Sequence, residues 1–317
     1  MNLKSALEDI LFSNQDFSLI SRGINYLYER FSETTNIYAG NLTNEHMKET
    51  ANGKVVTPIH AAHCLKELAR TTHFLRAIHL AIEHHLKYKK SIRILYAGCG
   101  PYGTLLTPFS SIYSADQIQF TFLEIEEESV NSVKSLYTEL SISEYLESTH
   151  LCDATDPELS LAGSFDIIIS ETMQMALNNE CQVPITRNMV RFLTKEGTFI
   201  PERIALDVYL VGRKKDPLVP DSDEKEFVGT AFDFDINNLP AKDSETILTI
   251  PKSALEYLKL YTNIHLFGEE CLKAYQCSLT MPLILDRPLK KAGRSIRFWY
   301  EENERPKLKF EYLPENS

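Results

Sequence analysis

The sequence has few cysteines, and their spacing forms no recognisable framework. Six cysteines lie among 317 residues; no two of them form a Cys-x-x-Cys pair, and none has zinc-site spacing with a nearby histidine. We therefore expect reduced, mostly buried thiols rather than disulfides, and no metal site.

Long apolar runs are also missing. No stretch of the chain approaches the roughly 20 residues that a membrane-spanning helix requires. The N-terminus has no signal-peptide pattern, because Glu8 and Asp9 fall where such a peptide needs its apolar centre. These absences predict a cytoplasmic chain with no membrane partner.

Basic residues are too few for a protein that coats nucleic acid. The chain has 33 Lys and Arg against 44 Asp and Glu, a formal net charge of -11. Phosphate neutralisation drives most non-specific binding to DNA and RNA, so nucleic acid is not an expected partner. Hydrophobic residues make up 43% of the chain, which is enough for a substantial core.

Residues 1–90 are predicted to form a helical N-terminal cap. Apolar residues recur at three- and four-residue spacing from Leu7 to Phe31, as on one face of a helix. Residues 41–56 are polar, contain an Asn-Gly pair and are expected to form a loop.

A longer helix is predicted from Pro58 to the basic run that ends near residue 90. It contains six of the nine histidines of the chain. One straight helix cannot bring them together around a metal ion. We expect this helix to lie beside a ligand pocket, with His60 or His63 as the histidine that could act as a base.

From residue 91 the pattern changes to an α/β one. Short apolar runs separated by helical segments predict a parallel sheet over residues 91–200. The runs are 91–97, 120–125, 149–154 and 165–170.

After Pro201 the chain becomes β-rich. Seven runs of strand-forming residues are joined by Pro, Gly, Asn and Asp, which predicts a barrel-like domain over 201–317 that binds substrate or forms a homodimer. The runs are 203–212, 226–236, 244–250, 263–268, 276–285, 294–302 and 307–313.

A glycine-rich loop ends the first apolar run. Gly98, Gly100 and Gly103 stand in a Gly-x-Gly-x-x-Gly pattern between a strand and a helix. Such a loop lets a ligand approach the backbone and its free amides closely. A dinucleotide-binding loop has the same spacing and an acid about 20 residues further on, a position that Glu124 fills.

Acidic residues end the next three strands. Glu124 ends the second, Asp153 the third and Glu171 the fourth. In open α/β sheets the carboxyl ends of parallel strands meet at one edge, where ligands bind. There Glu124 could accept the hydroxyls of a ribose, and Asp153 could accept an adenine amino group.

Together these motifs make residues 92–200 resemble the class I S-adenosylmethionine-dependent methyltransferases. The resemblance implies a Rossmann-like sheet and S-adenosylmethionine as cofactor. Tyr96 stands where the family often has an acid, and Pro101-Tyr102 is bulkier than the usual loop. The cofactor-binding residues that it implies are Tyr96, Ala97, Gly98, Gly100, Gly103, Glu124, Ile125, Asp153 and Ala154.

A second, narrower resemblance is to the protein arginine methyltransferases. Their Ser-Glu-Trp-Met loop, with a second glutamate nine positions after the first, is similar to Ser170–Met173 followed by Glu180. Their entry into a β-barrel looks like Gly197 and Ile200-Pro201.

This resemblance gives the two glutamates catalytic roles. Glu171 would orient and partly neutralise the nucleophile, and Glu180 would assist, since two carboxylates can hold a planar cation. The chain departs from the family over residues 1–90, which do not match the family's paired-tyrosine helix, and in two further places. Thr172 replaces the tryptophan of the loop, and Trp299, the only tryptophan, has no preceding histidine, so the His-Trp loop of the barrel is absent.

The sequence therefore predicts a methyltransferase that acts on nitrogen or oxygen of a small molecule or peptide. Protein arginine is one alternative acceptor. A second alternative is aminocarboxypropyl transfer, because Gly98-Cys-Gly100-Pro101 is similar to the loop of nicotianamine synthases. An NAD-dependent oxidoreductase also fits the glycine loop, and a non-catalytic scaffold is favoured only by Tyr96.

Overall fold

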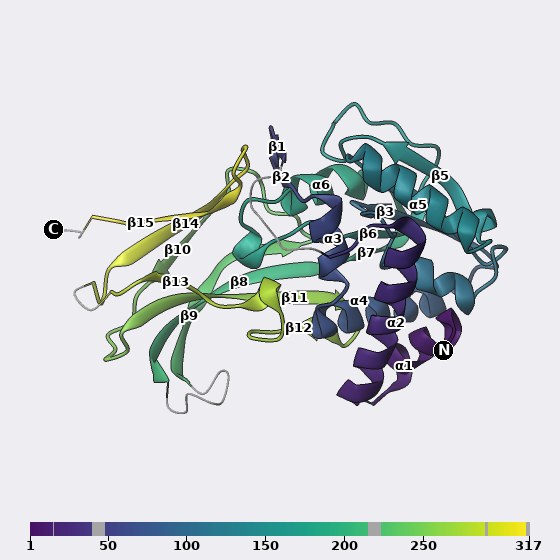
Figure 1. The fold of residues 1–317 in the computed structure, drawn as a ribbon. Coiled ribbons are helices and arrows are strands. Elements are labelled where there is room, and N and C mark those ends of the chain that lie inside the picture. Colours follow the sequence, from purple (N-terminus) through teal and green to yellow (C-terminus); the bar gives the residue numbers. More distant parts are fainter. Residues whose placement is uncertain (15, 40–47, 215–222, 289–290, 315–317) are drawn as a thin grey trace.

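Five parallel strands form the central sheet of the computed structural model, which describes residues 1–314 apart from 15, 40–47, 215–222 and 289–290 (Figure 1). The order across the sheet is β5-β4-β3-β6-β7, and every neighbouring pair is parallel. The strands are β3 (Ile92–Ala97), β4 (Ile118–Glu124), β5 (Leu146–Leu151), β6 (Phe165–Ser170) and β7 (Leu193–Ile200).

The order places β3 between β4 and β6, because the chain returns after β5 from one edge of the sheet to the other side of β3. Such a switch point opens a crevice at the carboxyl ends of the strands, where the glycine loop lies. The sequence predicted four of these strands, with β5 placed three residues late. It missed β7, an edge strand that includes Lys195, Glu196 and Gly197 and is buried only over its last three residues.

The N-terminal helices lie beside the parallel sheet. Helices α1 and α2 are on the side away from the β-rich part, whereas α4 also packs against β11 (Tyr257–Phe267) and β12 (Glu270–Leu272) of that part (Figure 1). The side chains of Asn2 and Asp16 accept hydrogen bonds from the first turns of α1 and α2 and so cap them. The helices are α1 (Leu3–Phe12), α2 (Phe17–Thr35), α3 (Pro58–Cys64) and α4 (Leu68–Leu86).

The single long helix predicted from Pro58 is wrong. The chain turns at Leu65–Glu67 and begins a second helix, because the Thr71 hydroxyl donates to the Leu65 carbonyl at 2.9 Å and Glu67 becomes the N-cap of α4. The break matters for function, since it lets two helices of different direction approach one pocket.

The loop predicted over residues 41–56 is also partly wrong. Residues 48–55 form a hairpin of β1 (Lys48–Thr50) and β2 (Gly53–Val55) around the Asn-Gly pair. Residues 41–47 lie outside the described part of the chain.

Two longer helices accompany the parallel sheet, α5 (Glu127–Glu139) after β4 and α6 (Gln182–Met189) before β7. Single turns of 3-10 helix join the other segments. These are η2 (Thr107–Ser111), η3 (Ser143–Tyr145), η4 (Met175–Leu177), η5 (Val190–Phe192) and η6 (Ser278–Thr280).

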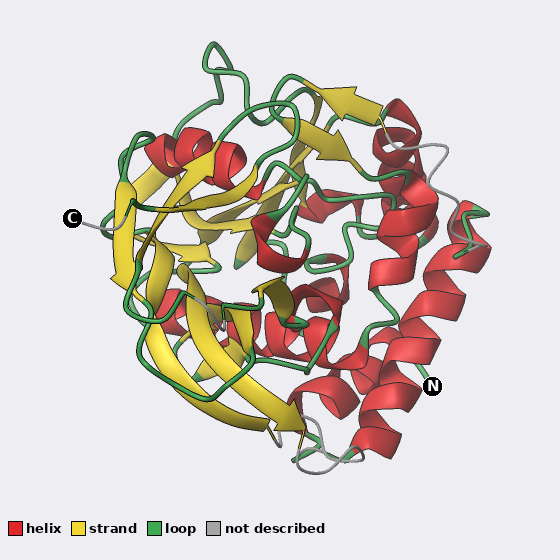
Figure 2. Ribbon diagram, turned by 90° about the vertical axis from the view of Figure 1, so that its left-hand side faces the viewer, coloured by secondary structure: helices red, strands yellow, loops and turns green. Residues whose placement is uncertain are grey.

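The chain beyond Pro201 is antiparallel β-structure, as predicted. One sheet has the order β12-β11-β8-β9, with β13 also paired to β11, and a smaller sheet has the order β10-β14-β15. Figure 2 shows long antiparallel strands on the left-hand side of the molecule and most of the helices on the right. The strands are β8 (Arg203–Lys214), β9 (Asp223–Asp235), β10 (Glu245–Thr249), β11 (Tyr257–Phe267), β12 (Glu270–Leu272), β13 (Leu283–Asp286), β14 (Ser295–Glu301) and β15 (Lys307–Tyr312).

One apolar core runs from the N-terminal helices, along one face of the parallel sheet, into the β-rich part. Strand β14 contributes three residues to this core. Ile296, Phe298 and Tyr300 face inward because they alternate with more exposed residues along the strand. A smaller cluster fills the opposite face of the parallel sheet beneath α6. Among the helices of the described residues, none has both the length and the apolar character needed to cross a bilayer.

Candidate functional site

A cavity of about 520 Å³ lies at the carboxyl ends of the parallel strands. The α3–α4 break, the β1–β2 hairpin and η6 contribute to its walls. Most of the residues predicted from the sequence line it, namely Tyr96, Gly98, Gly100, Glu124, Ile125, Asp153, Ala154, Glu171 and Glu180.

Two predicted residues do not line the cavity. Ala97 is fully buried within the sheet, between its partners Leu123 and Ser170. Gly103 lies in the turn after the glycine loop, next to the ring of Phe122.

Glycine is required at Gly98 and Gly100 because neighbouring residues approach the backbone closely and because φ is positive at both positions. Gly98 has φ +75°, and a Cβ there would lie 2.5 Å from Cγ2 of Thr172. Gly100 has φ +63°, and its Cβ would lie 3.1 Å from that of Ala61 on α3. The loop therefore passes between the end of β6 and α3, with no room for a side chain at Gly98.

Glu124 is held rigidly at the end of β4. It is buried, and its carboxylate accepts hydrogen bonds from the backbone N–H groups of Gly100 and Ile125 at 2.8 Å and of Glu126 at 3.0 Å. Burial raises its pKa although these three donors oppose the shift. A carboxylate offers about four acceptor sites, so Glu124 can still accept a hydroxyl group of a ligand.

Asp153 is oriented by its own turn. Its Oδ1 accepts hydrogen bonds from the Thr155 N–H at 2.8 Å and the Thr155 hydroxyl at 2.7 Å. Asn52, at the tip of the hairpin, donates to the same Thr155 hydroxyl oxygen at 2.8 Å. Both bonds to Asp153 use Oδ1, so Oδ2 can accept an amino group of a ligand.

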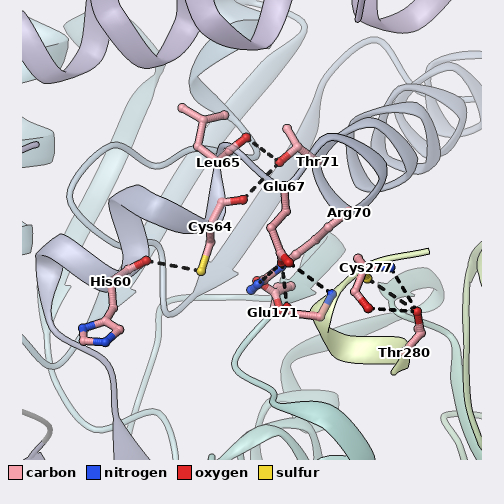
Figure 3. Close-up of polar contacts among 10 residues, drawn as sticks. His60, Cys64, Leu65, Glu67, Arg70, Thr71, Glu171, Cys277 and Thr280 are labelled. Carbon is pink, nitrogen blue, oxygen red and sulfur yellow. Dashed lines mark hydrogen bonds and ion pairs between the residues drawn. The ribbon is translucent and has the colours of Figure 1, made fainter. Parts of the chain in front are cut away.

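Arg70 on α4 is a central residue of the site that sequence reasoning missed. Its guanidinium forms a short ion pair with Glu171 and donates to Glu67 at 3.1 Å (Figure 3). Burial alone would lower the pKa of Arg70, but Glu171 and its other neighbours raise it, so the residue stays charged. One signal in the sequence could have identified Arg70, because it lies on the same apolar helix face as Phe74 and Ala77. A charged residue on such a face is rarely buried unless it has an oppositely charged partner.

The two predicted catalytic glutamates lie in different surroundings. Glu171 pairs with Arg70 through Oε2, while its buried Oε1 has no hydrogen-bond partner among the described residues. Burial raises its pKa against the opposing charge of Arg70. For Glu180, burial and the nearby Glu171 raise the pKa to about 7.

The segment between these glutamates has an unusual backbone. Ala176, Leu177 and Asn179 have φ of 58°, 54° and 63°, a region that non-glycine residues rarely occupy. The β-rich part holds the segment in place, because the Tyr300 hydroxyl donates to the Leu177 carbonyl at 2.7 Å and the Ala176 N–H donates to the Thr262 hydroxyl at 3.2 Å. Strained backbone of this kind clusters at functional sites.

Five of the nine histidines fall into two groups. His60 and His63 line the cavity, and burial lowers the pKa of His60, whose Nδ1 lies 2.9 Å from the Thr57 hydroxyl. The ring nitrogens of three others contact neighbouring elements. These contacts are His73 with Glu270, His79 with Tyr113 and His85 with Thr198. In the described ranges, no group of three or more His, Cys, Asp or Glu is arranged to hold a metal ion.

Comparison with known proteins shows the fold. No protein-family model and no curated protein match the chain. It is similar to the PRMT1 enzyme-prozyme heterotetramer of Trypanosoma brucei, solved with AdoHcy, with TM-score 0.55 and 15% identity over 80% of this chain and 93% of that chain. It is also similar to protein arginine methyltransferase 10 of Arabidopsis thaliana, with TM-score 0.53 and 11% identity over 81% and 94% of the two chains. These likenesses confirm the predicted class I methyltransferase fold, a Rossmann-like sheet followed by a β-rich part.

Proposed function

We propose that this protein is an S-adenosylmethionine-dependent methyltransferase that acts on nitrogen or oxygen of a small molecule or peptide. The main support is the arrangement within one cavity of two acids suited to an adenosine, Glu124 and Asp153, and a buried carboxylate oxygen of Glu171 that has no partner among the described residues. The solved T. brucei relative was captured with AdoHcy, the product form of this cofactor.

The residues lining the cavity fit each part of the cofactor. Gly98 and Gly100 have no side chains, so the cofactor could approach the backbone of the loop closely. Glu124 would accept the ribose hydroxyls, and Oδ2 of Asp153 would accept the adenine amino group. Arg70 would pair with the carboxylate of the amino-acid moiety, because a guanidinium can serve several acceptors at once.

The reaction needs positioning more than proton chemistry from the protein. A bound sulfonium supplies a methyl group that is already activated, so in-line alignment with the acceptor accounts for most of the rate. Oε1 of Glu171 would accept an N–H or O–H of the acceptor and so orient its lone pair. Glu180, whose pKa is about 7, would take the proton that the acceptor loses.

The surroundings of the glutamates favour an amine over a hydroxyl acceptor. Glu171 and Glu180 are both buried, and Arg70 already pairs with Glu171. A cationic acceptor would supply the additional positive charge that two buried carboxylates require. A narrower alternative acceptor is an arginine side chain of a protein, because both solved relatives are named as arginine methyltransferases. Two departures from that family weaken this alternative, namely Thr172 in place of the loop tryptophan and the missing His-Trp loop.

Binding measurements test the proposal directly. We would titrate the purified protein calorimetrically with S-adenosylmethionine, S-adenosylhomocysteine, NAD and NADP. Micromolar binding of the first two alone is expected. Binding of NAD alone would reject the methyltransferase proposal and favour the oxidoreductase, and binding of none of the four would favour a scaffold.

The by-product of turnover identifies the transferred group. Methyl transfer releases S-adenosylhomocysteine and a proton, whereas aminocarboxypropyl transfer breaks a different bond to the sulfur and releases methylthioadenosine. Mass spectrometry of reactions with candidate amines would detect either product. Methylthioadenosine as the main product would replace the proposed reaction with the alternative one.

A second copy of the chain remains a proposed partner for residues 201–317. The support is limited to the T. brucei relative, which was solved as a heterotetramer. Sedimentation velocity would measure the mass directly, and a monomer at all protein concentrations would reject a homodimer.

A further inference from the structure

A continuous hydrogen-bonded chain connects the β-rich part to the cavity. It runs from Ser278 through Glu67 and Arg70 to Glu171. Figure 3 shows the last three of these residues. Of the described residues after Pro201, only Ser278 and Leu279 line the cavity. The chain is therefore a direct route by which the β-rich part can influence the groups around a ligand.

Ser278 holds both oxygens of the Glu67 carboxylate. Its backbone N–H donates to Oε1 at 3.1 Å and its hydroxyl donates to Oε2 at 2.9 Å. Two bonds from one residue fix the plane of a carboxylate as well as its position. The same Oε2 accepts the Arg70 guanidinium at 3.1 Å, so the placement of Arg70 depends on how Glu67 is held.

The short helix that carries Ser278 is itself anchored. The Thr280 N–H donates to the Cys277 carbonyl at 3.1 Å, and the Cys277 N–H donates to the Thr280 hydroxyl at 3.3 Å. Thr280 is fully buried and the turn packs against β11, so the β-rich part holds the turn in place. Figure 3 shows this turn beside Glu67 and Arg70.

Arg70 cannot take its position from Glu171 alone. Glu171 forms one ion pair with a guanidinium that has five N–H donors, which leaves the guanidinium free to pivot about that contact. Glu67 supplies the second point of attachment, on the opposite terminal nitrogen. With both attachments, the remaining donors of Arg70 point in fixed directions.

We infer that Ser278 is a positioning residue, which through Glu67 orients Arg70 toward the carboxylate of the cofactor. This inference rests on the proposed function, because it assigns Arg70 to the amino-acid moiety of S-adenosylmethionine. It makes the β-rich part a contributor to cofactor affinity. The contribution is confined to one end of the cofactor, since the adenosine end is bound by Glu124 and Asp153.

The test compares two ligands that share the adenosine and differ in the amino-acid moiety. Affinities for S-adenosylhomocysteine and for methylthioadenosine, which lacks the carboxylate, are measured with Ser278→Ala, Ser278→Thr and wild type. Ser253→Ala, in the same β-rich part but outside the cavity lining, is the matched control.

We expect Ser278→Ala to raise the Kd for S-adenosylhomocysteine about three- to tenfold, because the hydroxyl bond to a charged group is lost while the backbone bond remains. The Kd for methylthioadenosine should not change, and Ser278→Thr should restore the affinity. In a Glu67→Gln background, the further change to Ala at 278 should add little, because the two residues act through one route.

Two results would overturn the inference while leaving the proposed function intact. One is wild-type affinity of Ser278→Ala for S-adenosylhomocysteine. The other is an equal loss of affinity for both ligands in Ser278→Ala, which would mean that Ser278 only supports the fold. If wild-type protein binds no S-adenosylhomocysteine, the proposed function fails and this inference fails with it.

Discussion

Two buried carboxylates near the end of β6 differ in how each is neutralised. Glu171 has Arg70 against one oxygen, so its charge is paired inside the protein. Glu180 is neutralised mainly by protonation, because burial and the charge of Glu171 raise its pKa to about 7. One carboxylate is therefore suited to hold a ligand, and the other to exchange a proton near neutral pH.

Glu180 should make the stability of the protein depend on pH. Its folded-state pKa of about 7 lies above the ordinary 4.5, so the folded state binds the proton more tightly. Its contribution to the free energy of unfolding is unperturbed below pH 4.5, falls as pH rises, and reaches its lowest value above pH 7. Glu180→Gln removes this loss and should be more stable than wild type by on the order of 2 kcal/mol at pH 8, with a much smaller difference at pH 4.5.

Urea unfolding of both proteins at the two pH values measures this difference. Glu139→Gln, at an exposed position on α5, controls for the loss of one surface charge. A difference between Glu180→Gln and wild type that stays the same at both pH values would contradict the assigned pKa.

Glu124 should contribute directly to ligand affinity. We expect Glu124→Ala to weaken binding of S-adenosylhomocysteine at least tenfold, since a hydrogen bond to a charged group is worth about 1.5–3 kcal/mol. Calorimetry measures the change, and Glu139→Ala serves as an exposed control in the same part of the chain. Unchanged affinity would remove Glu124 from the site.

At the scale of elements, the site depends on loops that pass very close to one another. The glycine loop lies against the segment that follows β6, at Gly98 and Thr172. That segment continues through three residues with positive φ, held by Thr262 and Tyr300 from the β-rich part. Neither loop could keep this shape without its neighbours.

The contact between Gly98 and Thr172 gives a prediction with a built-in rescue. Gly98→Ala places a Cβ 2.5 Å from Cγ2 of Thr172 in a backbone with φ +75°, so both collision and strain should abolish ligand binding. Adding Thr172→Ser removes that methyl group and keeps the hydroxyl that contacts Gln182. The double variant should recover part of the affinity and retain a backbone penalty of about 1–2 kcal/mol.

Thr172→Ser alone is the control, and it should bind S-adenosylhomocysteine nearly as wild type does. Equal affinities for Gly98→Ala and the double variant would show that backbone strain, and not the methyl collision, determines the loss.

At the scale of the whole molecule, polar contacts supplement the shared core between the parallel sheet and the β-rich part. Arg187 on α6 donates to Glu302, just after β14, at 2.8 Å, and both side chains are largely buried. His73 on α4 contacts Glu270 on β12 at 2.6 Å. The cavity therefore lies between parts that are joined by both apolar and charged contacts.

Removing one partner of the Arg187–Glu302 pair should lower the free energy of unfolding more than removing both partners. After Arg187→Met, Lys242 at 3.8 Å is the ion-pair partner that remains for the largely buried Glu302 among the described residues, so stability should fall by roughly 3 kcal/mol. Replacing Glu302 by Leu in addition should recover much of that loss, because an apolar pair needs no charge compensation.

Urea unfolding tests this prediction with two probes. Trp299, the only tryptophan, reports on β14, while far-ultraviolet circular dichroism reports mainly on the helices. A continuous core predicts coincident transitions for the wild type. A double variant no more stable than Arg187→Met would contradict the pairing energetics.

Sequence alone determined the fold class and one end of the cavity. Glycines at a strand end and acids at Glu124, Asp153 and Glu171 follow from the local pattern, since the carboxyl ends of parallel strands meet at one edge of the sheet. The β-rich character after Pro201 was equally visible, because period-two alternation is a local signal.

Only the tertiary structure determined the other end of the cavity, where Arg70 and Ser278 lie. Arg70 and Ser278 are separated by about 200 residues, and both contact Glu67 because α4 begins at a break that no local signal revealed. Strand β7 escaped prediction because its burial comes from pairing with β6 and not from its own composition. The positive φ of Ala176 and Leu177 is likewise imposed by partners distant in the sequence, because long-range contacts can stabilise a conformation that local preference disfavours.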